Sequence, residues 1–280
     1  MNAHLNWDYV LDNINNTIKL LVYTGSESDA IVYGSYEINE KIYKTKIGSS
    51  EESYSNNYMF SNKSPQTIIF SDNIDTSDCT NMSGMFRNCP VTNINFGSGF
   101  DTSNVKYMEC MFENCYNLTN LNLSIFDTSN VIRMRRMFYG CENITHFLLN
   151  NFDTSNVTTM DTMFGYCEKL ESIDISNFNT SNVTNMFSMF ANCNKLVDIN
   201  ISNFDTSNVT TMNSMFSECF ELKNLDLRSF NTINVKNMNY MFYYCKKIEA
   251  IVVSKDKWIT NQATKNMMFD DCGITEVSYI

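Results

Sequence analysis

The sequence predicts an α/β repeat protein: a solenoid with a parallel β-sheet on one face, short helices on the other, and a small β-rich cap before it. Three kinds of residue recur at the same spacing of 26. Met-Phe pairs begin at Met85 and at every twenty-sixth residue as far as Met241, and single phenylalanines recur from Phe100 to Phe230. The cysteines recur in step, at Cys89, Cys115, Cys141, Cys167, Cys193, Cys219 and Cys245. A period of 20–50 residues is typical of solenoids, propellers and arrays.

The first half of each unit has the spacing of a helix face. One unit shows this clearly. Its apolar positions, separated by steps of three, three, one and three, are Val131, Met134, Met137, Phe138 and Cys141. This pattern predicts a short helix with one buried face. The Thr-Ser-Asn before it suits an N-cap, because a short side-chain oxygen accepts a free backbone N–H.

The second half of each unit alternates apolar and polar residues, as in Leu121 and Leu123 or Leu225 and Leu227. A period of two predicts a short strand. Stacked units would align these strands in a parallel sheet and bury columns of Phe, Met, Val and Cys between sheet and helices. The Met and Phe columns are therefore interpreted as core packing, and no cofactor is expected.

We expect two parts, a cap at residues 1–64 and a solenoid at 65–280 with about eight 26-residue units. Three strands are predicted in the cap, at 17–23, 30–36 and 41–47, followed by a polar loop at 49–64. Residues 67–70 would start the stack, and 274–280 would close it. The cap would cover the first edge strand, which otherwise invites aggregation.

The charge of the chain excludes some partners. The net charge is −11, which opposes nucleic-acid binding because that binding needs Lys and Arg to neutralise phosphates. The run Arg133, Arg135 and Arg136 is interpreted as a solvated helix face. No apolar stretch approaches the ~20 residues of a membrane span. No signal peptide is visible at the N-terminus.

No catalytic or metal-binding constellation is recognised. The two histidines, His4 and His146, stand alone, and no nucleotide-binding or zinc-protease motif occurs. A column of Asp and Asn from Asp101 to Asn231 offers too few oxygens per unit for calcium, so it is interpreted as a ladder of Asx-turns. The column cysteines are expected to be buried free thiols, with disulfides as the alternative. Cys110 breaks the column at an outward helix position and is the candidate for a reactive thiol.

Two surfaces are candidates for partner binding. Outward strand positions vary between units while core positions do not; these are Asn93, Asn95, Asn120, Asn122, His146, Leu148, Ser172, Asp174, Asp198, Asn200, Asn224 and Asp226. Tyrosine is enriched at binding hot spots. The candidate tyrosines of the helix side are Tyr139, Tyr166, Tyr240, Tyr243 and Tyr244.

The repeated unit resembles the BspA-like branch of the leucine-rich-repeat proteins. Its clearest copies are FDTSNVTTMDTMFGYCEKLESIDISN at 152–177 and FNTSNVTNMFSMFANCNKLVDINISN at 178–203. The resemblance implies a leucine-rich-repeat-like solenoid on a cell surface or outside the cell. Such a protein would be a non-enzymatic adhesion module that binds a protein or glycoprotein on a host or neighbouring cell. Two alternatives stay open: a structural or receptor-binding subunit of a phage tail or similar particle, and an intracellular scaffold.

Overall fold

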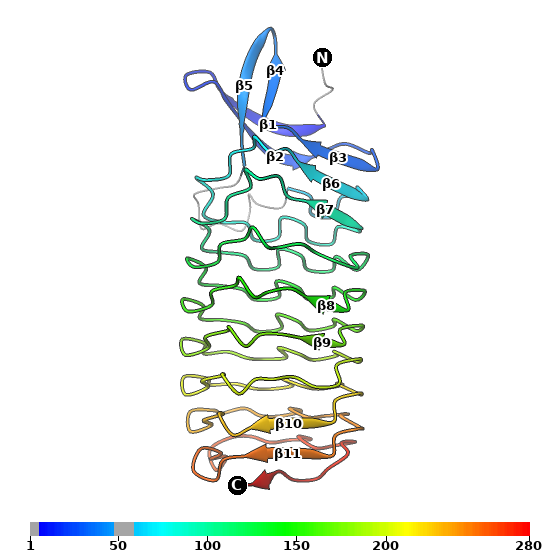
Figure 1. Ribbon diagram of the computed structural model, residues 1–280, viewed down its shortest axis with the longest axis vertical. Helices are drawn as coiled ribbons and strands as arrows, with labels where there is room; N and C mark the ends of the chain where they lie inside the picture. The colour runs from blue at the N-terminus through cyan, green and yellow to red at the C-terminus, as the bar shows by residue number, and fades with distance from the viewer. Residues whose placement is uncertain (1–5, 48–58) are drawn as a thin grey trace.

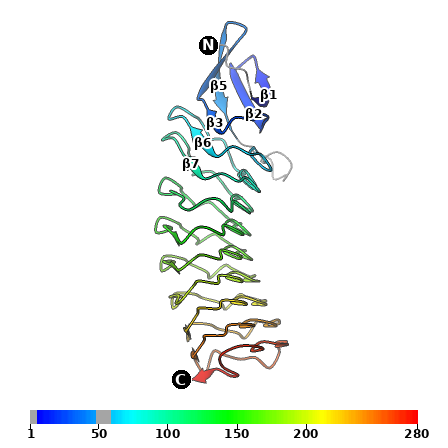
Figure 2. The ribbon, with the colours of Figure 1, turned by 90° about the vertical axis from the view of Figure 1, so that its right-hand side faces the viewer.

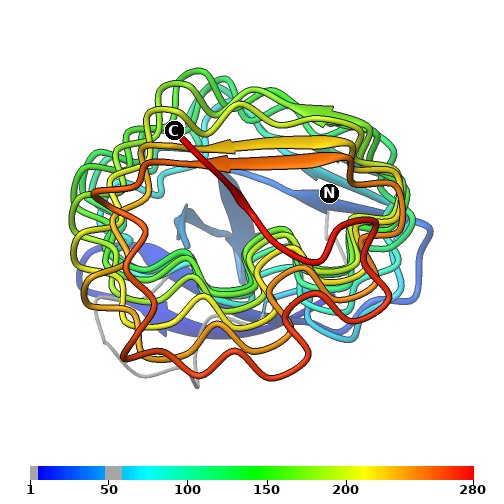
Figure 3. The ribbon, with the colours of Figure 1, turned by 90° about the horizontal axis from the view of Figure 1, so that it is seen from below.

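The computed structural model describes residues 6–47 and 59–280. It is a parallel β-solenoid of about ten coils, stacked in chain order from the cap to the C-terminal strand (Figures 1 and 2). Seen along the stack, each coil is a flattened ring with a strand segment on one long side and a zigzag of turns on the other (Figure 3). We call these sides the strand face and the turn face. The predicted solenoid is confirmed, and the predicted helices are wrong.

The cap has more strands than predicted. One antiparallel-and-parallel sheet runs in the order β1-β2-β5-β4 and contains β1 (Trp7–Asp12), β2 (Thr17–Tyr23), β5 (Lys41–Lys46) and β4 (Ser35–Ile38). The single strand predicted at 30–36 is two strands in two sheets, because the chain turns after β3 (Asp29–Val32). β3 leaves the cap sheet and pairs in parallel with the first strand of the solenoid.

The strand face is a column of short parallel strands. β3 pairs with β6 (Thr67–Phe70), and β6 pairs with β7 (Asn93–Asn95). The residues of β6 were predicted to start the stack, and β3 covers its edge. Two further groups continue the column: β8 (His146–Phe147) with β9 (Ser172–Ile173), and β10 (Asn224–Leu227), β11 (Ala250–Val253) and β12 (Ser278–Tyr279). The predicted closing strand is thus present as β12.

The core consists of columns of identical side chains. The Phe rings of the Met-Phe pairs stack nearly parallel from Phe60 to Phe269, with centroids 5.2–6.0 Å apart. Met, Val, Leu and Cys columns lie beside them and are almost completely buried. One coil alone could not bury these residues, so neighbouring coils stabilise one another.

Turns occupy the segments that were predicted to be helices, and no helix is found in residues 6–47 or 59–280. Successive N–H groups alternate between two kinds of partner. Met108, Cys110 and Phe112 donate to carbonyls of the next coil, at 2.9–3.1 Å. The residues between them include Met111 and Glu113, which donate to the carbonyl three residues earlier. A helix would need every N–H to bond four residues back, so this pattern excludes it.

In each coil from the one with Met85 to the one with Met268, two left-handed residues produce the zigzag. One precedes the Met-Phe pair and one precedes the column cysteine, as with Gly84 and Asn88, or Arg136 and Gly140. Their φ values lie between 50° and 69°. A left-handed residue interrupts helical geometry, and the ladder between coils replaces the lost hydrogen bonds. The spacing of three, three, one and three between apolar residues therefore indicates one buried face of consecutive turns.

One coil was missed. Met59 and Phe60 lie 26 residues before Met85 and Phe86, inside the segment predicted to be a polar loop. Both are buried, and the N–H of Phe60 donates to the carbonyl of Met85. The loop prediction is therefore wrong for residues 59–64, and its remainder at 49–58 lies outside the described residues.

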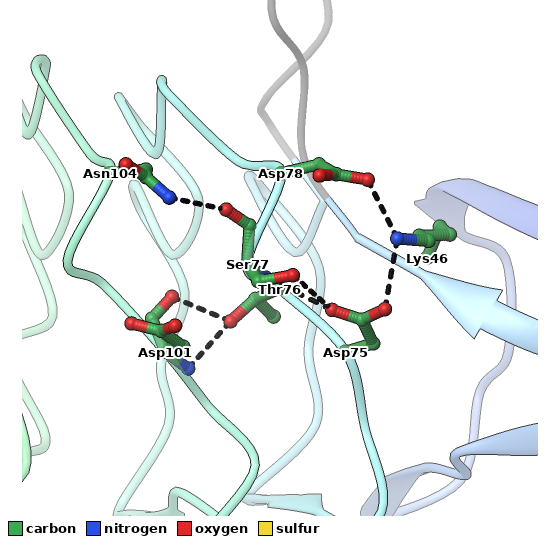
Figure 4. Close-up of polar contacts among 7 residues, drawn as sticks. All are labelled: Lys46, Asp75, Thr76, Ser77, Asp78, Asp101 and Asn104. Carbon is green, nitrogen blue, oxygen red and sulfur yellow. Dashed lines mark hydrogen bonds and ion pairs between the residues drawn. The ribbon is translucent and has the colours of Figure 1, made fainter.

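The polar residues of the repeated Phe-Asp-Thr-Ser-Asn motif bind coil to coil. The hydroxyl of Thr76 donates to the carbonyl of Asp101 and accepts the N–H of the same residue (Figure 4). The carboxylate of each Asp accepts the N–H two residues later, which makes the predicted Asx-turn. Asn104 donates its side-chain N–H to the carbonyl of Ser77 in the preceding coil. These contacts recur from coil to coil, so the motif is structural.

An ion pair attaches the cap to this ladder. Lys46, at the end of β5, lies 2.8 Å from a carboxylate oxygen of Asp75 and 2.6 Å from one of Asp78 (Figure 4). The hydrogen bond from Lys46 is the main reason that the pKa of Asp75 falls to about 2. The cap thus presents a cation to Asp75, which is in register with the Asp column, and to Asp78.

Candidate binding surfaces

All twelve predicted positions of the strand face are exposed, from Asn93 to Asp226. The structure divides them into two groups. At the second position of several pairs, a side-chain oxygen accepts the N–H of the residue two places later, as in Asn122, Asp174, Asn200 and Asp226. These side chains are used in turns that end the strand segments.

The first position of each pair is available to a partner. Asn120, Ser172, Asp198 and Asn224 are exposed, and no side-chain hydrogen bond to another described residue occupies them. His146 contacts only the hydroxyl of Thr145, at 2.9 Å. Leu148, at a second position, is 74% exposed and is the main apolar side chain of this face. Among the twelve predicted positions, Leu148 is the one apolar side chain in an otherwise polar stripe.

The candidate tyrosines lie on the turn face and form two clusters. The rings of Tyr139 and Tyr166, in neighbouring coils, are 5.2 Å apart. Tyr243 contacts both Tyr240 and Tyr244, with centroids at 5.6 and 4.5 Å. All five tyrosines keep part of their surface exposed. The sequence placed these tyrosines on helices, whereas the structure places them on turns.

A shallow pocket of about 330 Å³ surrounds the first cluster. It is lined by Arg135, Arg136, Tyr139, Asp161, Thr162, Tyr166, Phe187 and Ser188. The guanidinium of Arg136 lies over the ring of Tyr139, 4.2 Å from its centroid. Arg135 pairs with Asp161 at 2.8 Å. The pocket thus combines three aromatic rings with two arginines.

Buried acids pair with the arginines that were predicted to form a solvated helix face; the helix is absent, and Arg133 and Arg135 are exposed. Four of the five arginines of the chain lie in this part of the turn face. The carboxylate of Glu113 is almost fully buried and lies between Arg87, at 2.9 Å, and Arg136, at 3.2 Å. A buried charge is tolerated when it is paired, and removal of one partner is strongly destabilising. These contacts pre-orient Arg136 beside the tyrosines.

Tyr166 and Tyr244 have left-handed backbones, with φ of 60° and 59°. They occupy the position before the column cysteine, where other coils have Asn88, Asn114 and Gly140, and one has Glu218. Asn and Gly tolerate this conformation, whereas a bulky residue there is an outlier that costs roughly 1–2 kcal/mol. The conformation of these tyrosines is thus less favourable than that of the residues they replace.

The cysteines form an interior column. All ten have free thiols, and from Cys115 to Cys245 each column thiol donates to a Phe carbonyl of the preceding coil, at 3.0–3.4 Å. Cys110 does not have the environment of a reactive thiol. It is half-buried at a left-handed turn, and burial, with a contribution from Glu113, raises its pKa to about 12. Reactive cysteines have lowered pKa values.

Features of a metal site or of a membrane-spanning helix are absent from the described residues. No group of three or more His, Cys, Asp or Glu residues there is arranged to hold a metal ion. No helix suited to crossing a membrane is found in the same residues. His4 lies outside the part of the chain that the structure describes.

Comparison with known proteins identifies relatives of the repeat. The model of a family described as "Mycoplasma protein of unknown function, DUF285" matches residues 54–172, 117–199 and 167–277. A leucine-rich-repeat protein from Bacteroides ovatus has a similar fold, with a TM-score of 0.57, 17% identity, and coverage of 99% of this chain and 70% of that chain. A leucine-rich-repeat protein of T. pallidum has a TM-score of 0.48, 14% identity, and coverage of 79% and 89%. No curated protein matches. The resemblance to BspA-like leucine-rich-repeat proteins is confirmed.

Proposed function

The chain belongs to the family described as "Mycoplasma protein of unknown function, DUF285", and from this premise we propose that it is a non-enzymatic protein-binding module displayed at a cell surface, where it acts in adhesion. Its partner would be a protein or glycoprotein of a host or neighbouring cell. The leucine-rich-repeat fold, which provides long continuous surfaces for binding, supports this proposal.

The observation that carries the proposal is the left-handed tyrosine. Tyr166 and Tyr244 occupy a position that is Asn or Gly in most other coils and Glu218 in one, and a bulky residue there is unfavourable. Backbone strain of this kind is held by the surrounding structure and clusters at functional sites. The rings are partly exposed, and Tyr166 lines a pocket with two arginines. Tyr and Arg are the residues most enriched at the centres of protein interfaces.

The proposal places the main contact on the turn face, with the first strand-face positions as a second surface. Binding to a cell surface would be measured by incubating the labelled protein with intact host or bacterial cells and with their solubilised surface fractions. We expect capture of a surface protein, and loss of capture after the cells are treated with protease.

Two sets of variants would separate the faces. The first changes Tyr139, Tyr166, Tyr240, Tyr243 and Tyr244 to Ala. The second changes Asn120, Ser172, Asp198 and Asn224 to Ala, a comparison set on the opposite face of these and neighbouring coils. We expect the tyrosine set to weaken capture by about tenfold or more. Full capture by both sets would contradict the proposal.

Labelling of intact cells with a membrane-impermeant reagent would test the location. We expect the reagent to label this protein on intact cells. An unlabelled chain that co-purifies with a particle would favour the alternative of a particle subunit.

A further inference from the structure

The cap contains a second pocket, remote from the turn-face clusters. It lies where the cap sheet separates from the strand column, and its volume is about 220 Å³. Strands of both sheets supply its walls, since β1, β2 and β4 belong to the cap sheet and β3 to the column. Its principal lining residues are Trp7, Tyr23, Glu27, Asp29, Tyr33 and Tyr36. The pocket is therefore a product of the junction between cap and solenoid.

The aromatic residues of this pocket are held by the fold. Trp7, Tyr23 and Tyr36 are 2–6% exposed, and the rings of Trp7 and Tyr23 are 5.1 Å apart. The hydroxyl of Tyr36 accepts the backbone N–H of Tyr33. Tyr33 differs from the others because it is 46% exposed and meets Tyr36 edge to face. Its ring is thus open to an incoming group, in front of a fixed aromatic floor.

Two carboxylates complete the lining, and no Lys or Arg contributes to it. A side-chain oxygen of Glu27 accepts hydrogen bonds from the amide of Asn6, at 2.8 Å, and from the hydroxyl of Tyr23, at 3.0 Å. Hydrogen bonding, first to its own backbone N–H, lowers the pKa of Glu27, so the carboxylate is ionised at neutral pH. Asp29 is exposed and forms no ion pair with another described residue. The pocket therefore has a negative charge without a protein cation to balance it.

We propose that this pocket binds the guanidinium group of an arginine side chain. A guanidinium is planar, stacks on an aromatic ring and donates paired hydrogen bonds to a carboxylate. Tyr33 would supply the ring, and Glu27 and Asp29 the acceptors. An ammonium lacks the planar face, and a neutral amide lacks the charge. This site extends beyond the proposed function, because it uses the cap and does not depend on the tyrosines of the turn face.

Tryptophan fluorescence gives a direct test. The chain has two tryptophans, and Trp7 lines the pocket. In a Trp258→Phe variant, Trp7 is the one source of tryptophan fluorescence. The probes are N-acetyl-arginine amide, N-acetyl-lysine amide and the neutral isostere N-acetyl-citrulline amide. We expect a saturable signal with arginine, about tenfold weaker binding of citrulline, and intermediate binding of lysine. Added salt should weaken arginine binding, because the carboxylates are exposed. Isothermal calorimetry on the unaltered chain gives the same comparison if Trp258→Phe impairs folding.

Matched variants assign the effect to the pocket. Glu27→Gln, Asp29→Asn and Tyr33→Ala should each reduce arginine affinity by about threefold or more. Glu37→Gln and Tyr9→Ala change exposed residues of the same cap outside the pocket, and they should bind as the parent does. Absence of a saturable signal, or equal binding of arginine and citrulline, would overturn the proposal. Equal affinity for lysine would overturn the assignment to a guanidinium. Neither result would alter capture through the turn face.

Discussion

The hydrogen bonds that the buried Thr hydroxyls make between coils provide a quantitative test of the fold. Thr154 is completely buried, and its hydroxyl donates to the carbonyl of Asn179 at 2.9 Å and accepts the N–H of Asn179 at 2.8 Å. Thr154→Val keeps the shape but leaves both backbone groups unpaired. Each unpaired group costs about 1–3 kcal/mol, and the added methyl regains about 0.8 kcal/mol. The free energy of unfolding should therefore fall by about 3 kcal/mol.

Equilibrium urea unfolding followed by far-UV circular dichroism measures this loss. Thr154→Ser keeps both hydrogen bonds and should cost only about 1 kcal/mol for the lost methyl group. Thr158→Val is the control, because Thr158 is exposed and water can replace its bond to the carbonyl of Ile132. The reasoning is refuted if Thr154→Val unfolds within about 0.5 kcal/mol of the parent, or if Ser and Val are equally destabilised.

Three further predictions concern backbone and charge. Gly140→Ala should reduce the free energy of unfolding by about 1–2 kcal/mol and so lower the unfolding temperature in a calorimetric scan. The reason is that φ is +69° and the new Cβ would lie 2.4 Å from a side-chain oxygen. Ser188→Gly relieves a φ of 50°, so it should raise the unfolding temperature in the same calorimetric scan. Tyr166→Asn and Tyr139→Ala each break the ring contact between Tyr139 and Tyr166. Only Tyr166→Asn also relieves a left-handed Tyr, so its free energy of unfolding in urea should exceed that of Tyr139→Ala by about 1 kcal/mol. Burial raises the pKa of Cys167 and most column thiols well above the ordinary value. Above about pH 8.5 only the unfolded chain loses these protons, so stability should fall by up to about 1.4 kcal/mol per pH unit for each thiol; unchanged urea midpoints between pH 8 and 10 would contradict this.

The sequence was sufficient for the period, the core columns and the direction of the strand side chains. These features depend on burial, and burial repeats with the unit. The helices were wrong because Met134, Met137 and Phe138 share one face in a helix and also in a run of turns. The signal that separates the two is the Gly and Asn at fixed places, Gly84 and Asn88 above all, since they favour left-handed backbone.

Other features depend on contacts between coils, which the sequence of one unit does not contain. The alternation of N–H partners along Met108 to Phe112 exists only because another coil lies alongside. The burial of Glu113 between two arginines of different coils has the same origin. The strain of Tyr166 became visible only with its φ value, although a Tyr in a column composed mostly of Asn and Gly was the available sign.

The uniform connection between coils makes the length of this molecule adjustable. Every interior coil presents the same Thr donor to its successor and the same Asn and Cys donors to its predecessor. Duplication or loss of 26 residues would therefore create a join identical to the existing ones. Each such event would move the two ends apart or together by about one strand spacing, ~4.8 Å. Selection can thus set the reach of the protein in small steps without redesigning a single contact.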